Sequence, residues 1–152
     1  MDNLSPAARQ RTMRSVRSRN TAPEVAVRSM VHFLGYRFRL HRADLPGTPD
    51  LVIARRRAVI FVHGCFWHQH RCKRGARLPS TRKSYWLPKL RRNKERDQQQ
   101  VRELRKRGWR VLVLWECQVG RMGWLRERLT RFLAPTGTLP ASPGVIRRGA
   151  RP

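Results

Sequence analysis

Acidic residues are scarce in this chain. Its 152 residues include 35 Lys and Arg but only nine Asp and Glu, which leaves a formal net charge of +26. A charge of this size argues against an enzyme of neutral substrates. It indicates a polyanionic partner, because each phosphate that a cation neutralises releases condensed counterions. We therefore expect nucleic-acid binding, and the alternative is a merely cationic or ribosome-bound protein.

Long apolar runs and cysteines are also few. No stretch approaches the roughly 20 apolar residues of a membrane span, and Met1–Asn3 does not begin a signal peptide. We therefore expect a cytoplasmic protein with no membrane partner. In a reducing compartment the three cysteines indicate metal ligands or buried thiols rather than a disulfide framework.

The length fits one domain, which we expect between two basic ends. Residues 1–20 form a predicted basic arm, in which Ser5-Pro6 is a helix-start signal but large apolar residues are few. Residues 21–134 form the predicted domain. Residues 135–152 are rich in Pro, Gly, Ser and Arg, and we interpret them as a disordered basic tail because they offer too little apolar surface to fold.

Apolar periodicity predicts the elements of the domain. Helices are predicted from the capping-box residue Thr21 to Gly35, from about Trp86 to Arg107, and over a last segment with an apolar face of Leu125, Leu129, Phe132 and Leu133. Short β-prone runs predict a hairpin of Leu51–Ala54 and Ala58–Val62, and a buried strand at Trp109–Trp115. The class is therefore α/β.

The predicted hairpin brings Asp50 close to the end of its second strand and so suggests a metal site. If the turn centres on Arg56, Asp50 lies opposite Val62 and beside His63. A carboxylate, a main-chain carbonyl and an imidazole would then lie together. These groups suit a binding site for Mg²⁺, which takes few protein oxygens. The alternative is that Asp50 only ends the segment Gly47–Asp50, which is good turn chemistry in its own right.

Asp97 lies within the apolar stripe of the predicted long helix. The stripe follows steps of three and four residues through Leu87, Leu90, Lys94, Asp97, Val101 and Leu104. A carboxylate there needs a partner, because burying an unpaired charge is costly. The partner is either an arginine such as Arg96, in a structural pair, or a histidine from the hairpin end whose tautomer Asp97 would fix.

The cysteines suggest a second metal site. Cys65, Cys72 and Cys117 with one histidine would make a closed Cys₃His zinc site, and His70, one residue removed from Cys72, is the better fourth ligand. The spacing is not that of a standard zinc finger, and three buried thiols with nothing bound are the alternative. A closed site implies scaffolding, which leaves His63 and His68 for chemistry.

Glu24 and the aromatic residues each allow two interpretations. As the third residue after Thr21, Glu24 completes a capping box, and near an active site it could hold an outer-shell water of the metal. Phe66, Trp67 and Trp86 either pack in the core or, on a rigid loop beside nuclease-like chemistry, wedge open a base step.

These motifs resemble the very short patch repair (Vsr) endonuclease family, bacterial enzymes that nick DNA at T:G mismatches left by deamination of 5-methylcytosine. The similarity extends from about Arg14 to Leu133 and is carried by Leu45–Asp50, Ile60–His68, Glu95–Asp97, Gly108–Leu112 and Trp115–Cys117. Val62 stands where the family often has Thr, which a carbonyl ligand tolerates. Gln69 replaces one member of the frequent histidine run.

The resemblance implies a restriction-endonuclease-like α/β fold, with a central mixed sheet flanked by helices and a structural zinc site. It implies that Asp50 and the main-chain carbonyl of Val62 bind catalytic Mg²⁺. It also implies a set of residues that act on the attacking water or the scissile phosphate, namely His63 and His68 supported by Asp97 and Glu24.

By the same resemblance, the structural zinc ligands are Cys65, His70, Cys72 and Cys117, and the aromatics inserted into the duplex are Phe66, Trp67 and Trp86. We expect a nucleoid-associated monomer that acts on double-stranded DNA carrying a T:G mismatch and initiates very short patch repair, where partners could include other mismatch-repair proteins. The rival hypothesis is a zinc-stabilised DNA-binding module without catalysis. That rival does not explain a carboxylate at a strand start facing a histidine.

Overall fold

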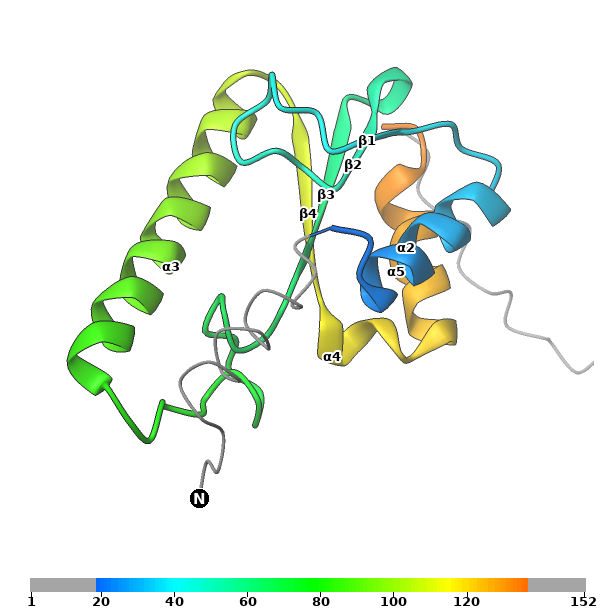
Figure 1. The fold of residues 1–152 in the computed structure, drawn as a ribbon. Helices are drawn as coiled ribbons and strands as arrows, with labels where there is room; N and C mark the ends of the chain where they lie inside the picture. Colours follow the sequence, from blue (N-terminus) through cyan, green and yellow to red (C-terminus); the bar gives the residue numbers. More distant parts are fainter. Residues whose placement is uncertain (1–18, 137–152) are drawn as a thin grey trace, which may run out of the picture.

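A four-stranded mixed sheet separates two layers of helices in the computed structural model, which describes residues 19–136 (Figure 1). The strands follow the order β1-β2-β3-β4 and comprise Arg39–Leu40, Leu51–Ile53, Ala58–His63 and Arg110–Trp115. The pairs β1–β2 and β2–β3 are antiparallel, and β3–β4 is parallel. Most of the predicted arm (1–20) and tail (135–152) lies outside the described residues.

The helices lie on both faces of the sheet, as Figure 1 shows. One face carries the long helix α3 (Lys83–Lys106), and the other carries α2 (Ala22–Phe33), α4 (Glu116–Val119) and α5 (Met122–Leu133). A short 3₁₀ turn, Ala54–Arg56, closes the β2–β3 hairpin. The predicted α/β class, with a mixed sheet flanked by helices, is confirmed. Among the described residues, no helix is both long enough and apolar enough to cross a membrane.

Two apolar clusters arise from the alternation of side chains along the strands. On β3, Ala58 and Ile60 belong to the larger cluster, which α2 and α5 complete with residues such as Val27 and Leu129. The alternate residues of β3 belong to a smaller cluster beneath α3, formed by Leu45, Val52, Val59, Phe61 and Leu104. The sheet therefore buries both of its faces.

Helix α2 begins where the sequence predicts it, with a shifted cap. Thr21 Oγ1 accepts a hydrogen bond from Glu24 N at 3.4 Å, as an N-cap should. The Glu24 carboxylate, however, accepts from Asn20 N at 2.9 Å rather than from Thr21 N. Glu24 thus still serves the helix start, through a main-chain N–H one residue earlier than a capping box uses.

Three predictions need correction. Helix α3 begins at Lys83, three residues before the predicted start, because Pro88 removes only one hydrogen bond near the helix start and does not end the helix. The hairpin pairs Leu51 with Ile60, one residue from the predicted register. Strand β4 is buried at Leu112 and Leu114 but only half-buried elsewhere, because it lies at the edge of the sheet. Neither β1 nor α4 was predicted.

The packing of β4 predicts a large effect of Leu114→Ala. Leu114 is fully buried in the larger cluster, so its truncation should lower the free energy of unfolding by about 2–5 kcal/mol, measured by urea denaturation. Leu78→Ala is the matched control, because Leu78 is 59% exposed and its truncation should change stability by less than about 0.5 kcal/mol. Equal effects of the two substitutions would contradict this packing.

Candidate functional site

Asp50 immediately precedes β2 and is positioned by a tight turn. Gly47 has φ +77, and a Cβ atom there would lie 2.8 Å from Gln100 Oε1 of α3, so the turn needs glycine to pack against that helix. Asp50 Oδ2 accepts a hydrogen bond from Val62 N at 2.7 Å. The predicted proximity of Asp50 and Val62 is therefore present despite the shift in register.

Two further residues adjoin the Asp50 carboxylate. His41 Nε2 lies 3.3 Å from Glu24 Oε2 and 3.8 Å from Asp50 Oδ1. The sequence did not point to His41, because its neighbour β1 is only two residues long and gives no periodic signal. Glu24, which is buried, lies in the same cluster, as its second interpretation required.

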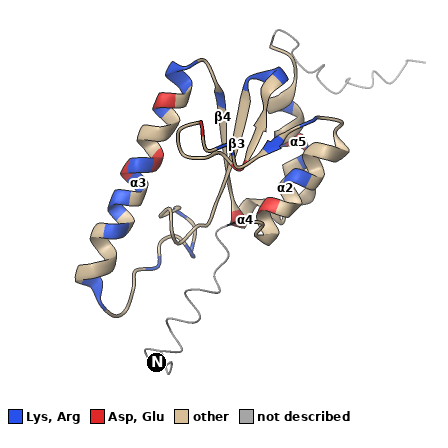
Figure 2. Ribbon diagram, turned by 45° about the horizontal axis from the view of Figure 1, so that its top comes forward, with Lys and Arg blue, Asp and Glu red and all other residues tan. Residues whose placement is uncertain are grey.

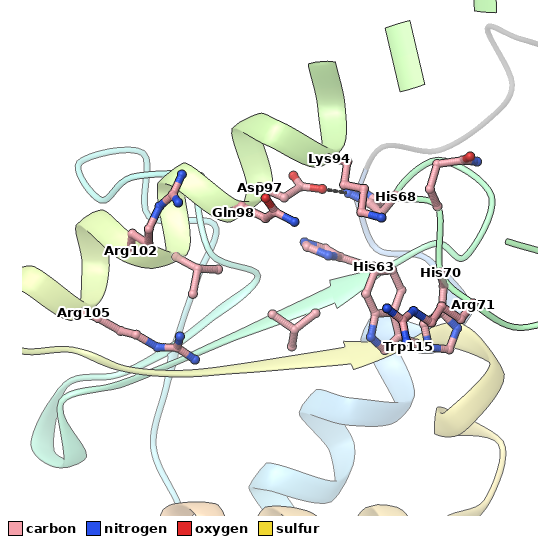
Figure 3. A pocket seen from close by; sticks show the side chains of 13 residues that line it. His63, His68, His70, Arg71, Lys94, Asp97, Gln98, Arg102, Arg105 and Trp115 are labelled. Carbon is pink, nitrogen blue, oxygen red and sulfur yellow. Dashed lines mark hydrogen bonds and ion pairs between the residues drawn. The ribbon is translucent and has the colours of Figure 1, made fainter. Parts of the chain in front are cut away.

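His63, His68 and Asp97 form a second cluster, shown in Figure 3. His63 ends β3, and the ring of His68 stacks on it with centroids 3.9 Å apart and an interplanar angle of 5°. His68 Nδ1 is hydrogen-bonded to Asp97 Oδ2 of α3. Of the two partners considered for Asp97, the structure has the histidine, since Arg96 bonds to Asn93 instead.

Burial controls the protonation of two site residues. Desolvation raises the pKa of the Asp50 carboxyl to about 6, although the Val62 N–H opposes the shift. Desolvation likewise lowers the pKa of His63 to about 4, and repulsion from His68 adds to the effect. At neutral pH His63 is therefore uncharged, whereas Asp50 is ionised in surroundings that solvate its charge poorly.

Two cavities meet at the histidine cluster. One, of about 540 Å³, is lined by Asp50, His41 and Glu24 on one side and by the histidine cluster on the other. The second, of about 630 Å³, lies between α3 and β4 and is drawn in Figure 3. Its walls include Lys94, Arg102 and Arg105.

Basic residues recur along α3, as the blue segments of Figure 2 show. Its exposed cationic residues include Arg91, Arg92, Lys94, Arg96, Arg102, Arg105 and Lys106. Because Lys94, Arg102 and Arg105 line one cavity and Arg96 lines the other, the site can attract a phosphate group to the carboxylates and histidines.

A third cluster contains the three cysteines and His70. One ligand atom from each of Cys65, His70, Cys72 and Cys117 lies within 4.8 Å of the other three, and His70 Nδ1 is 3.5 Å from Cys117 Sγ. The parallel pairing explains the meeting: His63 pairs with Trp115, and each of Cys65 and Cys117 follows its strand end by two residues. The cysteines form no disulfide.

The thiols of this cluster have different environments. Burial raises the pKa of the Cys65 thiol, whereas the Gly75 N–H, which donates to Cys72 Sγ at 3.4 Å, lowers the pKa of the Cys72 thiol. The segment also has two supports that sequence reasoning missed. Trp115 stacks on the His70 ring with centroids 4.3 Å apart, and Glu116 Oε1 accepts from Cys65 N at 3.3 Å.

The three aromatic residues lie together outside the core. Ring centroids are 5.2 Å apart for Phe66 and Trp67 and 5.8 Å apart for Trp67 and Trp86. All three are half-buried, and neither of the apolar core clusters within residues 19–136 includes them. The core-packing interpretation is therefore wrong for the described structure.

Known proteins that are similar to this chain include DNA endonucleases and nicking enzymes, in agreement with the clusters and the basic surface described above. The family described as DNA mismatch endonuclease Vsr matches residues 1–74. The type II nicking enzyme V.XorIIP of Xanthomonas oryzae pv. oryzae is 54% identical over 135 residues, which cover 89% of this chain and 98% of that protein. The DNA mismatch endonuclease Vsr of Escherichia coli is 44% identical over 128 residues, covering 84% and 81%. The chain that carries this site is therefore a member of the Vsr family of DNA mismatch endonucleases.

Proposed function

We propose that the protein nicks double-stranded DNA at T:G mismatches that arise from deamination of 5-methylcytosine, by Mg²⁺-dependent phosphodiester hydrolysis, and so initiates very short patch repair. The observation that carries the proposal is that Asp50 and the His63–His68–Asp97 cluster line one cavity of a protein with net charge +26. The names of the relatives, a mismatch endonuclease and nicking enzymes, support it. From the family assignment we also infer that the mixed sheet and its helices have the arrangement found in restriction endonucleases.

The residues around Asp50 fit a hard cation. The Val62 N–H donates to Asp50, and the N–H and C=O of one strand residue point to the same side, so the Val62 carbonyl is available beside the carboxylate. We assign Asp50 and Val62 as the Mg²⁺ ligands, with Glu24 close enough to hold a coordinated water. A bound Mg²⁺ would polarise the scissile phosphate and lower the pKa of a bound water. It would also offset the unfavourable burial of the Asp50 charge.

The two histidines are suited to proton transfer. A carboxylate can only accept a hydrogen bond, so Asp97 holds the proton of His68 on Nδ1 and leaves Nε2 free to take a proton from the attacking water. His63, which is uncharged because it is buried, fixes the His68 ring by stacking and faces the same cavity. Both histidines would therefore act at the scissile phosphate, with Asp97 in support.

The cysteine cluster fits tetrahedral zinc. With Zn–S bonds of about 2.3 Å, ligand atoms lie roughly 3.8 Å apart, close to the 3.5 Å between His70 Nδ1 and Cys117 Sγ and within the observed limit of 4.8 Å. Four protein ligands leave no open position. We assign a structural role, in which zinc would fix the loop that carries His68, Phe66 and Trp67.

The aromatic cluster supports mismatch selection. Phe66, Trp67 and Trp86 are bulky, half-buried and separate from the core, as expected of side chains that enter a base step. A mismatched step is easier to unstack than a matched one, so part of the selectivity would come from the deformation energy of the DNA.

Asp50→Asn should abolish Mg²⁺-dependent nicking of a plasmid with one T:G mismatch while DNA affinity changes little, because the basic surface stays intact. Gel assays with Mg²⁺ or EDTA and a binding titration measure the two quantities. Asp44→Asn is the matched control, since Asp44 is exposed and pairs with Arg42, and it should nick normally. Near-normal cleavage by Asp50→Asn would falsify the metal assignment, and a wild-type protein that binds but never nicks would favour the non-catalytic rival.

Cys117→Ser should release zinc and lower the melting temperature. Structural zinc contributes roughly 10–16 kcal/mol of apparent binding energy in small peptides, so one lost ligand should be evident by elemental analysis and thermal denaturation. Wild-type protein without stoichiometric zinc would rule out the Cys₃His assignment.

Phe66→Ala combined with Trp67→Ala should reduce discrimination between T:G and C:G substrates more than it reduces general affinity. Stacking on an aromatic is worth roughly 1–3 kcal/mol per base, so the preference should fall by at least about fivefold. Phe33→Ala is the control, because Phe33 is an exposed aromatic on α2. A double mutant that is destabilised yet fully selective would contradict the wedge.

A further inference from the structure

The cluster of Glu24, His41 and Asp50 contains an imidazole that the proposed Mg²⁺ site does not use. One ligand atom from each of these residues lies within 4.8 Å of the other two. They come from three separate segments: the first turn of α2, the residue after β1 and the residue before β2. His41 therefore joins the helix layer to the start of β2 at the carboxylate.

The backbone fixes His41 in this place. Leu40 pairs with Leu51, and His41 N continues the ladder by donating to the Asp50 carbonyl oxygen at 3.3 Å. His41 has φ +46, a conformation that histidine, asparagine and aspartate adopt more often than other side chains. The side chain is only 13% exposed, so the ring points into the protein rather than toward bulk water.

We propose that His41 Nε2 is a direct ligand of the divalent cation at Asp50 and that this nitrogen shifts the preference of the site from Mg²⁺ toward Mn²⁺. The proposal rests on the proposed metal site at Asp50 and adds to it a ligand and a selectivity.

The distances fit a shared octahedral cation. With metal–ligand bonds of about 2.1 Å, adjacent ligand atoms lie roughly 3.0 Å apart. His41 Nε2 lies 3.8 Å from Asp50 Oδ1, so a cation bound to both would need only a small shift of these two side chains, while Glu24 Oε2, 3.3 Å from the same nitrogen, stays close enough to hold a coordinated water. The alternative is that His41 only bridges the Glu24 and Asp50 carboxylates by hydrogen bonds, in which case no cation binds to its nitrogen.

The nitrogen has a predictable effect on selectivity. Mg²⁺ takes oxygen ligands and keeps its waters, whereas imidazole nitrogen suits first-row transition metals. Loss of the nitrogen should therefore weaken Mn²⁺ binding more than Mg²⁺ binding. A merely structural His41 would affect both cations equally or neither.

The test compares His41→Asn with the control His32→Asn. Asparagine tolerates positive φ, and His32 is an exposed histidine in the last turn of α2. Pulsed electron paramagnetic resonance on the Mn²⁺-loaded protein should detect a coupled imidazole ¹⁴N in the wild type and in His32→Asn but not in His41→Asn. Calorimetry should show Mn²⁺ affinity falling about tenfold in His41→Asn, with a change of less than about threefold for Mg²⁺.

Each outcome decides the question. A wild-type spectrum without nitrogen coupling, or a coupling that persists in His41→Asn, overturns the His41 ligand; the wild-type spectrum does so even if the variant fails to fold. Asp50→Asn separates this result from the proposed function. If Mn²⁺ binding depends on Asp50 but lacks nitrogen, only the His41 proposal fails, whereas Mn²⁺ binding unaffected by Asp50→Asn overturns the metal site and the His41 ligand together.

Discussion

Both halves of the site depend on the pairing of strand β3 with its two neighbours. The antiparallel ladder to β2 brings Asp50 within hydrogen-bonding distance of Val62, and the parallel ladder to β4 sets His63 beside Trp115. A slip of one residue in either ladder would turn every side chain of a strand to the opposite face. The apolar clusters on both faces resist such a slip, so core packing fixes the geometry of the site.

The segment after β3 uses this register twice. His68 stacks on His63, and His70, two residues later, stacks on Trp115 of the adjacent strand. The meeting of Cys65 with Cys117 ties the same segment to the end of β4. The loop after β3 therefore carries a candidate catalytic residue, His68, and a candidate metal ligand, His70. Any contact that fixes the start of this loop also orients the ring of His68.

The few acidic residues are concentrated where the site needs them. Glu24, Asp50 and Asp97 line one cavity, and Glu116 supports the cysteine cluster. The other acidic side chains that form ion pairs among the described residues do so with arginine, in exposed pairs: Asp44 with Arg42, Glu103 with Arg107 and Glu127 with Arg131. Exposed pairs of this kind contribute little to stability, so the surface keeps its excess of positive charge for a polyanion.

The sequence by itself determined the α/β class, six of the principal elements (α2, β2, β3, α3, β4 and α5) and the residue types of the site, because periodicity and metal or proton chemistry restrict which side chains can occur together. The hairpin contact was predictable because its partners are close in the chain. Only the tertiary structure decided that His68 is the partner of Asp97, 29 residues away, and that His41 adjoins Glu24, 17 residues away. These contacts depend on how a loop returns to the sheet and on one histidine with positive φ, neither of which leaves a periodic signal in the sequence.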